Sequence, residues 1–185
     1  LENVTNKITS SSLNTSAYVK ANIIDGLRAE ITGSFGHSTR EYHQFIPSSV
    51  VKGWNKGEGF NTTARRQNRS VQKYLFQSLL HYQKKINVHN LNAMAGFSLE
   101  ATDGTNSELR GSKFPDNSLE IFDMSDVTIT RARASLETPD RLLSYFGRFQ
   151  YGYSNRYFLT ASIRTDGSSK FGRDNRWGVF PALSG

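Results

Sequence analysis

Apolar and polar residues alternate with a period of two along most of the chain, and no stretch shows the 3.6-residue period of an amphipathic helix. Such alternation predicts β-strands whose two faces meet different surroundings. We expect strands at Asn14–Ile24, Leu27–His37, Ser70–Lys84, Asn90–Ala101, Leu143–Tyr153, Tyr157–Arg164 and from Arg176 onward, with a brief strand at Val127–Thr130. The sequence therefore predicts an all-β fold of about seven strands in an antiparallel meander.

The connections between these strands alternate in length. Short turns are predicted at Asp25-Gly26, near Asn87 and at Ser154-Asn155-Arg156. Longer connections are expected at two polar stretches, Ser38–Arg69 and Thr102–Asp140, and at the turn Asp166–Asn175. In a meander, alternate connections lie at the same end of the sheet. All the tight turns therefore fall at one end and the longer loops at the other, which is typical of transmembrane barrels of the bacterial outer membrane.

The residue types on the two predicted faces also suit a membrane barrel. Tyr82, Tyr153 and Tyr157 lie beside tight turns on the apolar face and Trp177 lies beside a loop, as expected of aromatic girdles at the two membrane boundaries. A water-filled interior would accept the charged and amide residues of the other face, which are Arg28, Glu30, Arg148, Gln150 and Arg164.

A soluble antiparallel sheet with one wet face produces the same alternation. Two alternatives therefore stay open at this point. The chain is either a segment of a large transmembrane β-barrel or a soluble or secreted β-sheet module that binds glycans or polyanions.

Composition changes this picture little. Of the 185 residues 36% are hydrophobic and 12% are aromatic, which favours thin amphipathic sheets over a thick aliphatic core. The formal net charge of +7 suits an anionic partner. The basic residues are scattered, so we expect no nucleic acid partner. The absence of cysteine excludes disulfides and thiolate metal sites.

No set of residues in the sequence predicts catalysis or metal binding. His37 and His43 do not have an established metal-ligand spacing. Asp103, Asn106 and Glu108 superficially resemble a calcium loop but lack its ordered pattern. We expect no enzymatic activity, no cofactor and no bound metal.

The C-terminal 42 residues, SYFGRFQYGYSNRYFLTASIRTDGSSKFGRDNRWGVFPALSG from Ser144 to Gly185, resemble a signature region of SusC/RagA-type TonB-dependent outer-membrane transporters. In that family a strand of the form YFGR-x-x-Y-x-Y leads through a short turn to Y-L-x-T-A-S-x-R-x-D-G-S-S-x-F-G and N-R-W-G-x-F-P-S. The motif positions matched here include Tyr145, Gly147, Arg148, Arg164, Asp166, Gly167, Ser168, Ser169, Phe171, Gly172, Asn175, Arg176, Trp177 and Gly178.

The resemblance implies that residues 1–185 belong to a single barrel domain of about 22 strands in a nutrient importer of a Bacteroidetes-type bacterium. It also implies a plug and TonB box outside these residues, a SusD-like surface lipoprotein as partner, energy from TonB, contact with outer-membrane lipid, and an oligosaccharide or peptide cargo. Leu1 opens directly into polar sequence and the strand pattern runs on to Gly185. We therefore expect a piece of a longer protein that does not fold alone, because open sheet edges and a lipid-facing surface favour aggregation.

Cargo contacts are expected from the long external loops. Trp54 and Phe60 are candidates to stack on sugar rings, and Arg65 and Arg66 are candidates to pair with carboxylates. The Asp166–Gly172 segment is expected to be a compact external turn. The alternative is that Arg164, Asp166 and Arg173 position the external loops or the lipoprotein.

Overall fold

The structure, a computed structural model, describes residues 4–48, 54–55, 59–60, 62–114 and 127–185. Its elements are β1 (Thr5–Ile24), β2 (Leu27–Ile46), β3 (Trp54–Asn55), β4 (Gly59–Phe60), β5 (Thr63–Ile86), β6 (His89–Ser112), β7 (Thr128–Leu136), β8 (Asp140–Tyr153), β9 (Tyr157–Ser168), the 3-10 turn η2 (Arg173–Asn175) and β10 (Trp177–Ser184). Within these ranges no helix is long and apolar enough to cross a membrane. The predicted all-β fold is confirmed.

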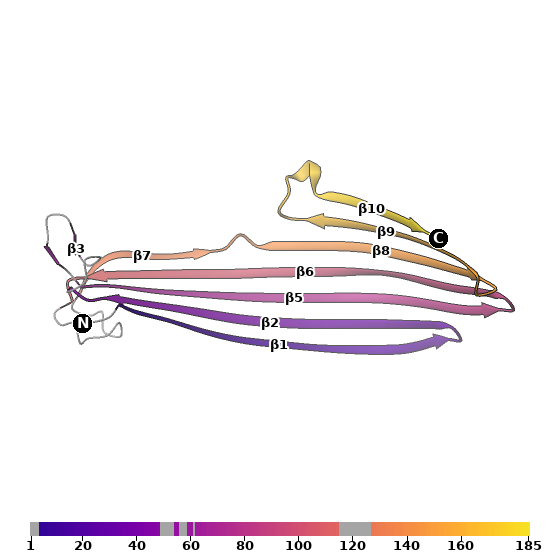
Figure 1. Ribbon diagram of the computed structural model, residues 1–185, viewed down its shortest axis with the longest axis horizontal. Helices are drawn as coiled ribbons and strands as arrows, with labels where there is room; N and C mark the ends of the chain where they lie inside the picture. Colours follow the sequence, from indigo (N-terminus) through magenta and orange to yellow (C-terminus); the bar gives the residue numbers. More distant parts are fainter. Residues whose placement is uncertain (1–3, 49–53, 56–58, 61, 115–126) are drawn as a thin grey trace. The chain divides into compact units, whose positions relative to one another are not determined.

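The main sheet is an antiparallel meander in the order β1-β2-β5-β6-β8-β9-β10 (Figure 1). Strand β6 pairs with β8 over residues 89–102 and with β7 over residues 105–112. Strands β7 and β8 thus follow one another along the same side of β6. The hydrogen-bonded path therefore contains seven strands, as the sequence predicts.

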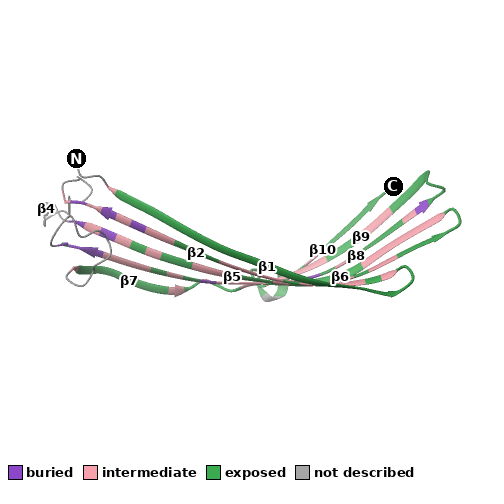
Figure 2. Cartoon of the chain, turned by 90° about the horizontal axis from the view of Figure 1, so that it is seen from below, coloured by how far each residue is buried: buried purple, intermediate pink, exposed green. Residues whose placement is uncertain are grey.

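The chain divides into two compact units, which are described separately. Unit 1 comprises Leu1–Leu13, His37–Val71 and Asp103–Thr138, and unit 2 comprises Asn14–Gly36, Gln72–Thr102 and Pro139–Gly185. Unit 1 contains a small core in which Phe45, Ala64 and Phe114 are buried and Val127 packs against them. Figure 2 marks the buried positions of β2 and β5 and shows β1 exposed along its whole length.

The tight turns of unit 2 form as the sequence predicts. Gly26 has a φ of 78°, and a side chain there would also meet the Gln83 carbonyl oxygen at 2.3 Å. The other two turns place Asn87, Ser154 and Asn155 in the same left-handed region. Adjacent turns are linked, because the Ser154 amide donates a hydrogen bond of 2.8 Å to the Val88 carbonyl. The tight turns therefore lie together at one end of the strands (Figure 1).

Both long loops expected from the sequence are largely strand, which corrects that prediction. Strand β2 continues to Ile46 and β5 begins at Thr63; β6 continues to Ser112 and β7 occupies Thr128–Leu136. These segments pair in the ladder while both of their faces carry polar residues, so the apolar alternation that marks a strand in sequence is missing. Residues 49–53, 56–58, 61 and 115–126 lie outside the described residues.

The register of unit 2 confirms two faces of opposite character. Leu91 pairs with Tyr151 and Ala93 with Phe149 on the apolar face, whereas Asn92 pairs with Gln150 on the polar face. Large side chains of the apolar face are exposed, and every buried hydrophobic side chain of the described chain belongs to unit 1. A soluble sheet would have to cover this apolar surface, whereas a membrane barrel turns it toward lipid.

Candidate functional site

The apolar face of unit 2 carries a row of aromatic rings that runs from strand to strand. Phe76 in β5 lies 5.7 Å from Phe97 in β6, measured between ring centroids, and Phe97 lies 6.4 Å from Tyr145 in β8. Tyr145 stacks on Trp177 of β10 at 6.3 Å with an interplanar angle of 21°. This row runs from β5 to β10 at the level of Trp177, as part of an aromatic girdle would.

A second aromatic group lies beside the tight turns. Tyr153 stacks on Tyr157 at 6.4 Å across the β8–β9 turn, and His89 lies 5.2 Å from Tyr153. The His89 Nδ1 atom also forms a hydrogen bond of 2.7 Å with the Tyr151 hydroxyl. Of the three tyrosines that the sequence places beside the tight turns, Tyr82, Tyr153 and Tyr157, the last two lie in this group, and Trp177 lies in the other.

The serine pair of the C-terminal motif closes a compact turn. The Ser169 Oγ atom accepts a hydrogen bond of 2.8 Å from the Arg141 amide, and the Ser169 amide donates to the Arg141 carbonyl at 2.9 Å. The Ser168 amide donates to the Arg176 carbonyl at 2.9 Å. Lys170 forms an ion pair of 2.7 Å with Asp140. These contacts form a compact turn, which begins only after β9 ends at Ser168, whereas the sequence analysis places Asp166–Ser168 in the turn as well.

Arg164 of the motif is held on the polar face of unit 2. Its Nε atom donates to Asp166 at 2.8 Å, its Nη2 atom donates to Ser144 at 3.1 Å, and its guanidinium lies 5.8 Å from the Phe146 ring centroid. Ser144 is completely buried. Arg164 and Asp166 thus fix each other, and the side chain of Arg173 lies outside the described residues.

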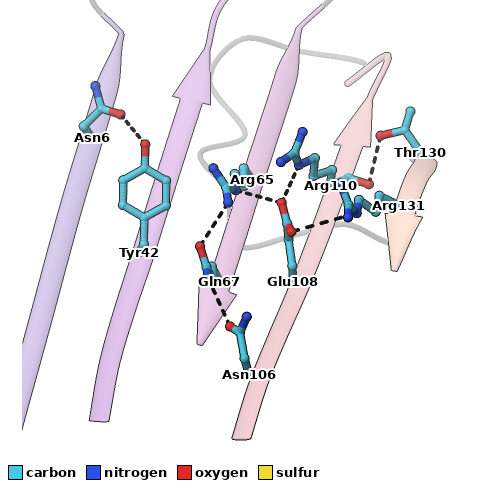
Figure 3. Close-up of polar contacts among 9 residues, drawn as sticks. All are labelled: Asn6, Tyr42, Arg65, Gln67, Asn106, Glu108, Arg110, Thr130 and Arg131. Carbon is cyan, nitrogen blue, oxygen red and sulfur yellow. Dashed lines mark hydrogen bonds and ion pairs between the residues drawn. The ribbon is translucent and has the colours of Figure 1, made fainter. Parts of the chain in front are cut away.

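Unit 1 contains a second polar face, which holds six arginines and two glutamates. We call the arginines, which are Arg40, Arg65, Arg69, Arg110, Arg131 and Arg133, the arginine cluster. Glu108 of β6 is its hub, with Arg110 Nε at 2.5 Å, Arg65 Nε at 2.8 Å and Arg131 Nε at 3.9 Å from its carboxylate oxygens. Figure 3 shows these side chains converging on Glu108 from β5, β6 and β7.

Electrostatics keeps Glu108 charged. This residue lies in unit 1, eleven positions along β6 beyond Phe97 of the aromatic row. Burial of the carboxyl group acts to raise its pKa, but the hydrogen bond from Arg110 and the charges of Arg65, Arg110 and Arg131 outweigh burial and hold the pKa below its usual range. Glu108 is therefore a fixed anion among cations.

The second glutamate, Glu137, is bound by Arg69 through two parallel hydrogen bonds, one of them 2.8 Å long. The hydrogen bond from Arg69 lowers the pKa of Glu137, and the Arg69 charge adds to this effect against the opposing effect of burial. This pair connects β5 to the residue that follows β7.

Amide and phenol side chains continue the same face. The Asn6 Oδ1 atom accepts hydrogen bonds from the Tyr42 hydroxyl at 3.1 Å and from Gln44 Nε2 at 2.9 Å. Gln67 Nε2 donates to Asn106 Oδ1 at 3.1 Å, and the Arg65 guanidinium lies 5.6 Å from the Tyr42 ring centroid. Side-chain hydrogen bonds thus join β1 to β2 and β5 to β6, and the contact of Arg65 with the Tyr42 ring joins these two pairs into one surface.

A cavity of ≈ 280 Å³ opens on this surface and is lined by Arg40, Tyr42, Arg65, Gln67 and Arg69. Among the described residues no carboxylate forms an ion pair with Arg40 or Arg133. Arg133 lies on this face because it pairs directly with Glu108 in the β6–β7 register. Counted over the part of the chain that the structure describes, six arginines of this face meet two carboxylates, which leaves an excess of positive charge there.

The structure separates the four residues that the sequence suggested for cargo binding. Arg65 and Arg66 lie in β5 and not in a loop, and as neighbours in a strand they point to opposite faces. Arg65 belongs to the arginine cluster and Arg66 does not. Trp54 pairs with Phe60 in the β3–β4 ladder, and their side chains lie outside the described residues.

Sequence reasoning missed most of this face. In the sequence Glu108 suggests only a calcium ligand, Arg131 and Arg133 belong only to the scattered basic residues, and no pattern points to Arg40, Arg69 or Arg110. A signal existed, because Glu108 and Arg110, like Arg131 and Arg133, are two residues apart and so share a face in a strand. The assumption that these residues lie in loops concealed it.

The residues considered for metal binding do not converge. His37 and His43 lie in β2 and not beside a loop, and six residues of strand separate them by roughly 20 Å. Asp103 and Asn106 are three residues apart in β6 and so point to opposite faces. Within the described ranges no group of three histidine, aspartate or glutamate side chains could hold a metal ion.

Comparison with known proteins identifies the fold and its relatives. No family model matches the chain. TonB-dependent receptor P3 of Formosa agariphila is 27% identical over 165 residues, which is 89% of this chain and 16% of the receptor. TonB-dependent receptor SusC of Bacteroides thetaiotaomicron is 50% identical over 54 residues, which is 29% of this chain and 5% of SusC.

Solved structures of the RagAB peptide importer have the same fold. The "closed-closed" state superimposes with a TM-score of 0.83 over 97% of this chain and 20% of that chain, at 18% identity. The chain thus spans about a fifth or less of the relatives it matches. The strand order, the two faces of the sheet and these likenesses all favour the barrel segment over the soluble β-sheet module. In sequence and in fold the chain is thus similar to SusC/RagA-type TonB-dependent receptors, and like them it is a segment of an outer-membrane β-barrel.

Proposed function

We propose that the whole protein is a TonB-dependent importer of oligosaccharides and that residues 1–185 form part of the wall of its single barrel domain. The observation that carries this proposal is a sheet with a lipid-type apolar face between two aromatic levels and a polar face behind it, in a chain related to SusC. The chain would do no covalent chemistry. The relatives are named as receptors and transporters, not as enzymes.

In this proposal the two units have different tasks. Unit 2 crosses the bilayer, with its tight turns on the periplasmic side. Unit 1 carries the longer connections and meets cargo on the outer side, because external segments are the long ones in barrels of this kind. The ion pair of Arg164 and Asp166 holds the polar face of unit 2 rigid beside the C-terminal turn.

The proposed partners are a SusD-like surface lipoprotein, which would cover the barrel, and TonB, which would act through a plug outside these residues. Peptide is the second candidate cargo, because the structural neighbours are titled as a peptide importer. Oligosaccharide is favoured by the tyrosine and amide side chains on the polar face of unit 1, because such groups complement a hydroxyl-rich ligand.

The test is uptake by whole cells. A strain lacking the complete gene, a strain lacking TonB and a complemented strain would each receive fluorescently labelled oligosaccharides or labelled tetrapeptides. We expect oligosaccharide uptake that is lost in both deletions and restored by complementation. Uptake of the tetrapeptides alone would show that the cargo is peptide and not oligosaccharide. Uptake that does not depend on the gene would contradict the proposed import function.

A further inference from the structure

We propose that the polar face of unit 1 binds acidic oligosaccharides, meaning sugar chains that carry carboxylates, and that the arginine cluster provides this selectivity. The inference rests on the proposed function and narrows its cargo. It follows from three independent features of the face, which are its charge, the geometry of its cavity and its neutral polar groups.

The positive charge of the arginine cluster exceeds the negative charge of the carboxylates that the structure pairs with it among the described residues. Glu108 binds three arginines and Glu137 binds one, which leaves Arg40 and Arg133 without a carboxylate among the described residues. Cations gathered on one surface repel one another, and a bound anion relieves this repulsion. A ligand with several carboxylates would therefore gain from each unpaired arginine.

The cavity brings an unpaired arginine beside an aromatic ring. Arg40 lines it together with Tyr42, Arg65 and Arg69. Arginine presents a planar fork that matches a carboxylate in bidentate geometry. The tyrosine ring offers a flat surface against which a sugar ring packs. An anion bound here would meet Arg40 first, because Arg65 and Arg69 are already paired.

The neutral groups select a sugar chain over an acidic peptide. Asn6, Gln44, Gln67 and Asn106 surround the arginines with amide donors and acceptors. A sugar presents many hydroxyl groups that both donate and accept, and amides satisfy both roles. An acidic peptide offers one N–H donor and one C=O acceptor per residue on its backbone, fewer than the several two-way hydroxyl groups of each sugar ring, so a sugar chain matches these amides better.

Binding and uptake are measured in cells that produce the complete receptor. The probes are fluorescent tetragalacturonate, the same tetrasaccharide with its carboxyl groups reduced to alcohols, and tetraglutamate. Cells without TonB report surface binding, and cells with TonB report uptake. The variants are Arg40→Gln, Arg40→Lys, and Arg66→Gln as a control of equal charge from the opposite face of β5, each quantified in isolated outer membranes.

We expect tetragalacturonate to bind about tenfold more tightly than its reduced form, which corresponds to one charge-assisted hydrogen bond. Arg40→Gln removes most of this preference, Arg40→Lys restores part of it, and Arg66→Gln leaves it unchanged. Raising the salt concentration weakens binding of the acidic chain more than binding of the reduced chain.

Equal binding of the acidic and reduced chains, or a preference that survives Arg40→Gln, would overturn the inference. Binding of tetraglutamate in place of tetragalacturonate would overturn the choice of sugar. TonB-dependent uptake of the reduced tetrasaccharide without any preference would leave the import function standing while this inference falls. Absence of TonB-dependent uptake for every probe, together with absence of binding, would count against both.

Discussion

The indole ring of Trp177 covers the backbone of Gly167. The two residues are direct partners in the β9–β10 register, and a Cβ atom at Gly167 would lie 2.9 Å from each of three indole ring atoms. The glycine of the D-G-S-S motif and the tryptophan of the N-R-W-G motif are therefore one packing unit. The ring so placed is the one that stacks on Tyr145 in the aromatic row.

Replacing Gly167 with alanine is expected to displace the indole and weaken its stack on Tyr145, because the backbone of a paired strand cannot move away. Overpacking of this kind costs about 1–3 kcal/mol. The measurement is the urea midpoint of the whole receptor refolded in lipid. Gly172→Ala is the matched control, since a Cβ there meets no atom within 4 Å. Equal urea midpoints for the two variants would show that the contact between Trp177 and Gly167 does not contribute to stability.

The assignment of the two faces in unit 2 predicts opposite effects for neighbouring residues. Ala93 pairs with Phe149 on the apolar face, and Asn92 pairs with Gln150 on the polar face. Ala93→Arg is expected to destabilise the barrel by about 2–4 kcal/mol, because it places a charge in lipid. Asn92→Arg is expected to be tolerated. The comparison uses folded receptor recovered in outer membranes, and a greater loss for Asn92→Arg would reverse the faces.

Glu108 is expected to stabilise unit 1, because it neutralises the arginines around it. Glu108→Gln keeps a hydrogen-bond acceptor but loses the charge, and we expect a loss of about 1–3 kcal/mol in the free energy of unfolding. Glu100→Gln, on the same strand but without an ion pair among the described residues, is the control. If the Glu108→Gln receptor were as stable as the Glu100→Gln receptor, Glu108 would not stabilise unit 1 through its charge.

The contribution of Glu108 should depend on pH. The arginines hold the pKa of its carboxyl group below the usual value, so the folded protein binds the proton less readily than the unfolded chain does. The difference in stability between the wild type and Glu108→Gln should be constant above about pH 4.3 and shrink as the pH falls through the lowered pKa. Urea midpoints at a series of pH values measure this, and a difference that grows on acidification would contradict it.

The sequence predicted unit 2 well because each strand there meets two different environments. Phe149 and Gln150 are neighbours of opposite character, and this contrast repeats along β6, β8 and β9. The C-terminal motif, Ser144–Gly185, also indicates the resemblance to SusC/RagA-type transporters. In unit 1 the contrast is missing, since Arg65 and Arg66 are both polar yet point to opposite faces. The sequence pattern therefore predicts loops where the structure has strands.

The polar face of unit 1 could not be predicted for the same reason. Arg65 and Glu108 are 43 residues apart in sequence, and only the pairing of β5 and β6 brings them to 2.8 Å. Charged residues in a segment taken for a loop give no indication of which side chains will meet. The spacing of Arg131 and Arg133 becomes informative only once β7 is known to be a strand.

The orientation of unit 2 in the outer membrane tests the account most directly. Single cysteines would replace Lys170, in the turn between β9 and β10, and Asn155, in the tight turn between β8 and β9, in the complete receptor without other reactive cysteines. A maleimide that does not cross the membrane would then be applied to intact and to permeabilised cells. We predict labelling of Lys170→Cys on intact cells and of Asn155→Cys only after permeabilisation. Labelling of Asn155→Cys on intact cells, or of both positions only after permeabilisation, would contradict a barrel wall with its tight turns in the periplasm.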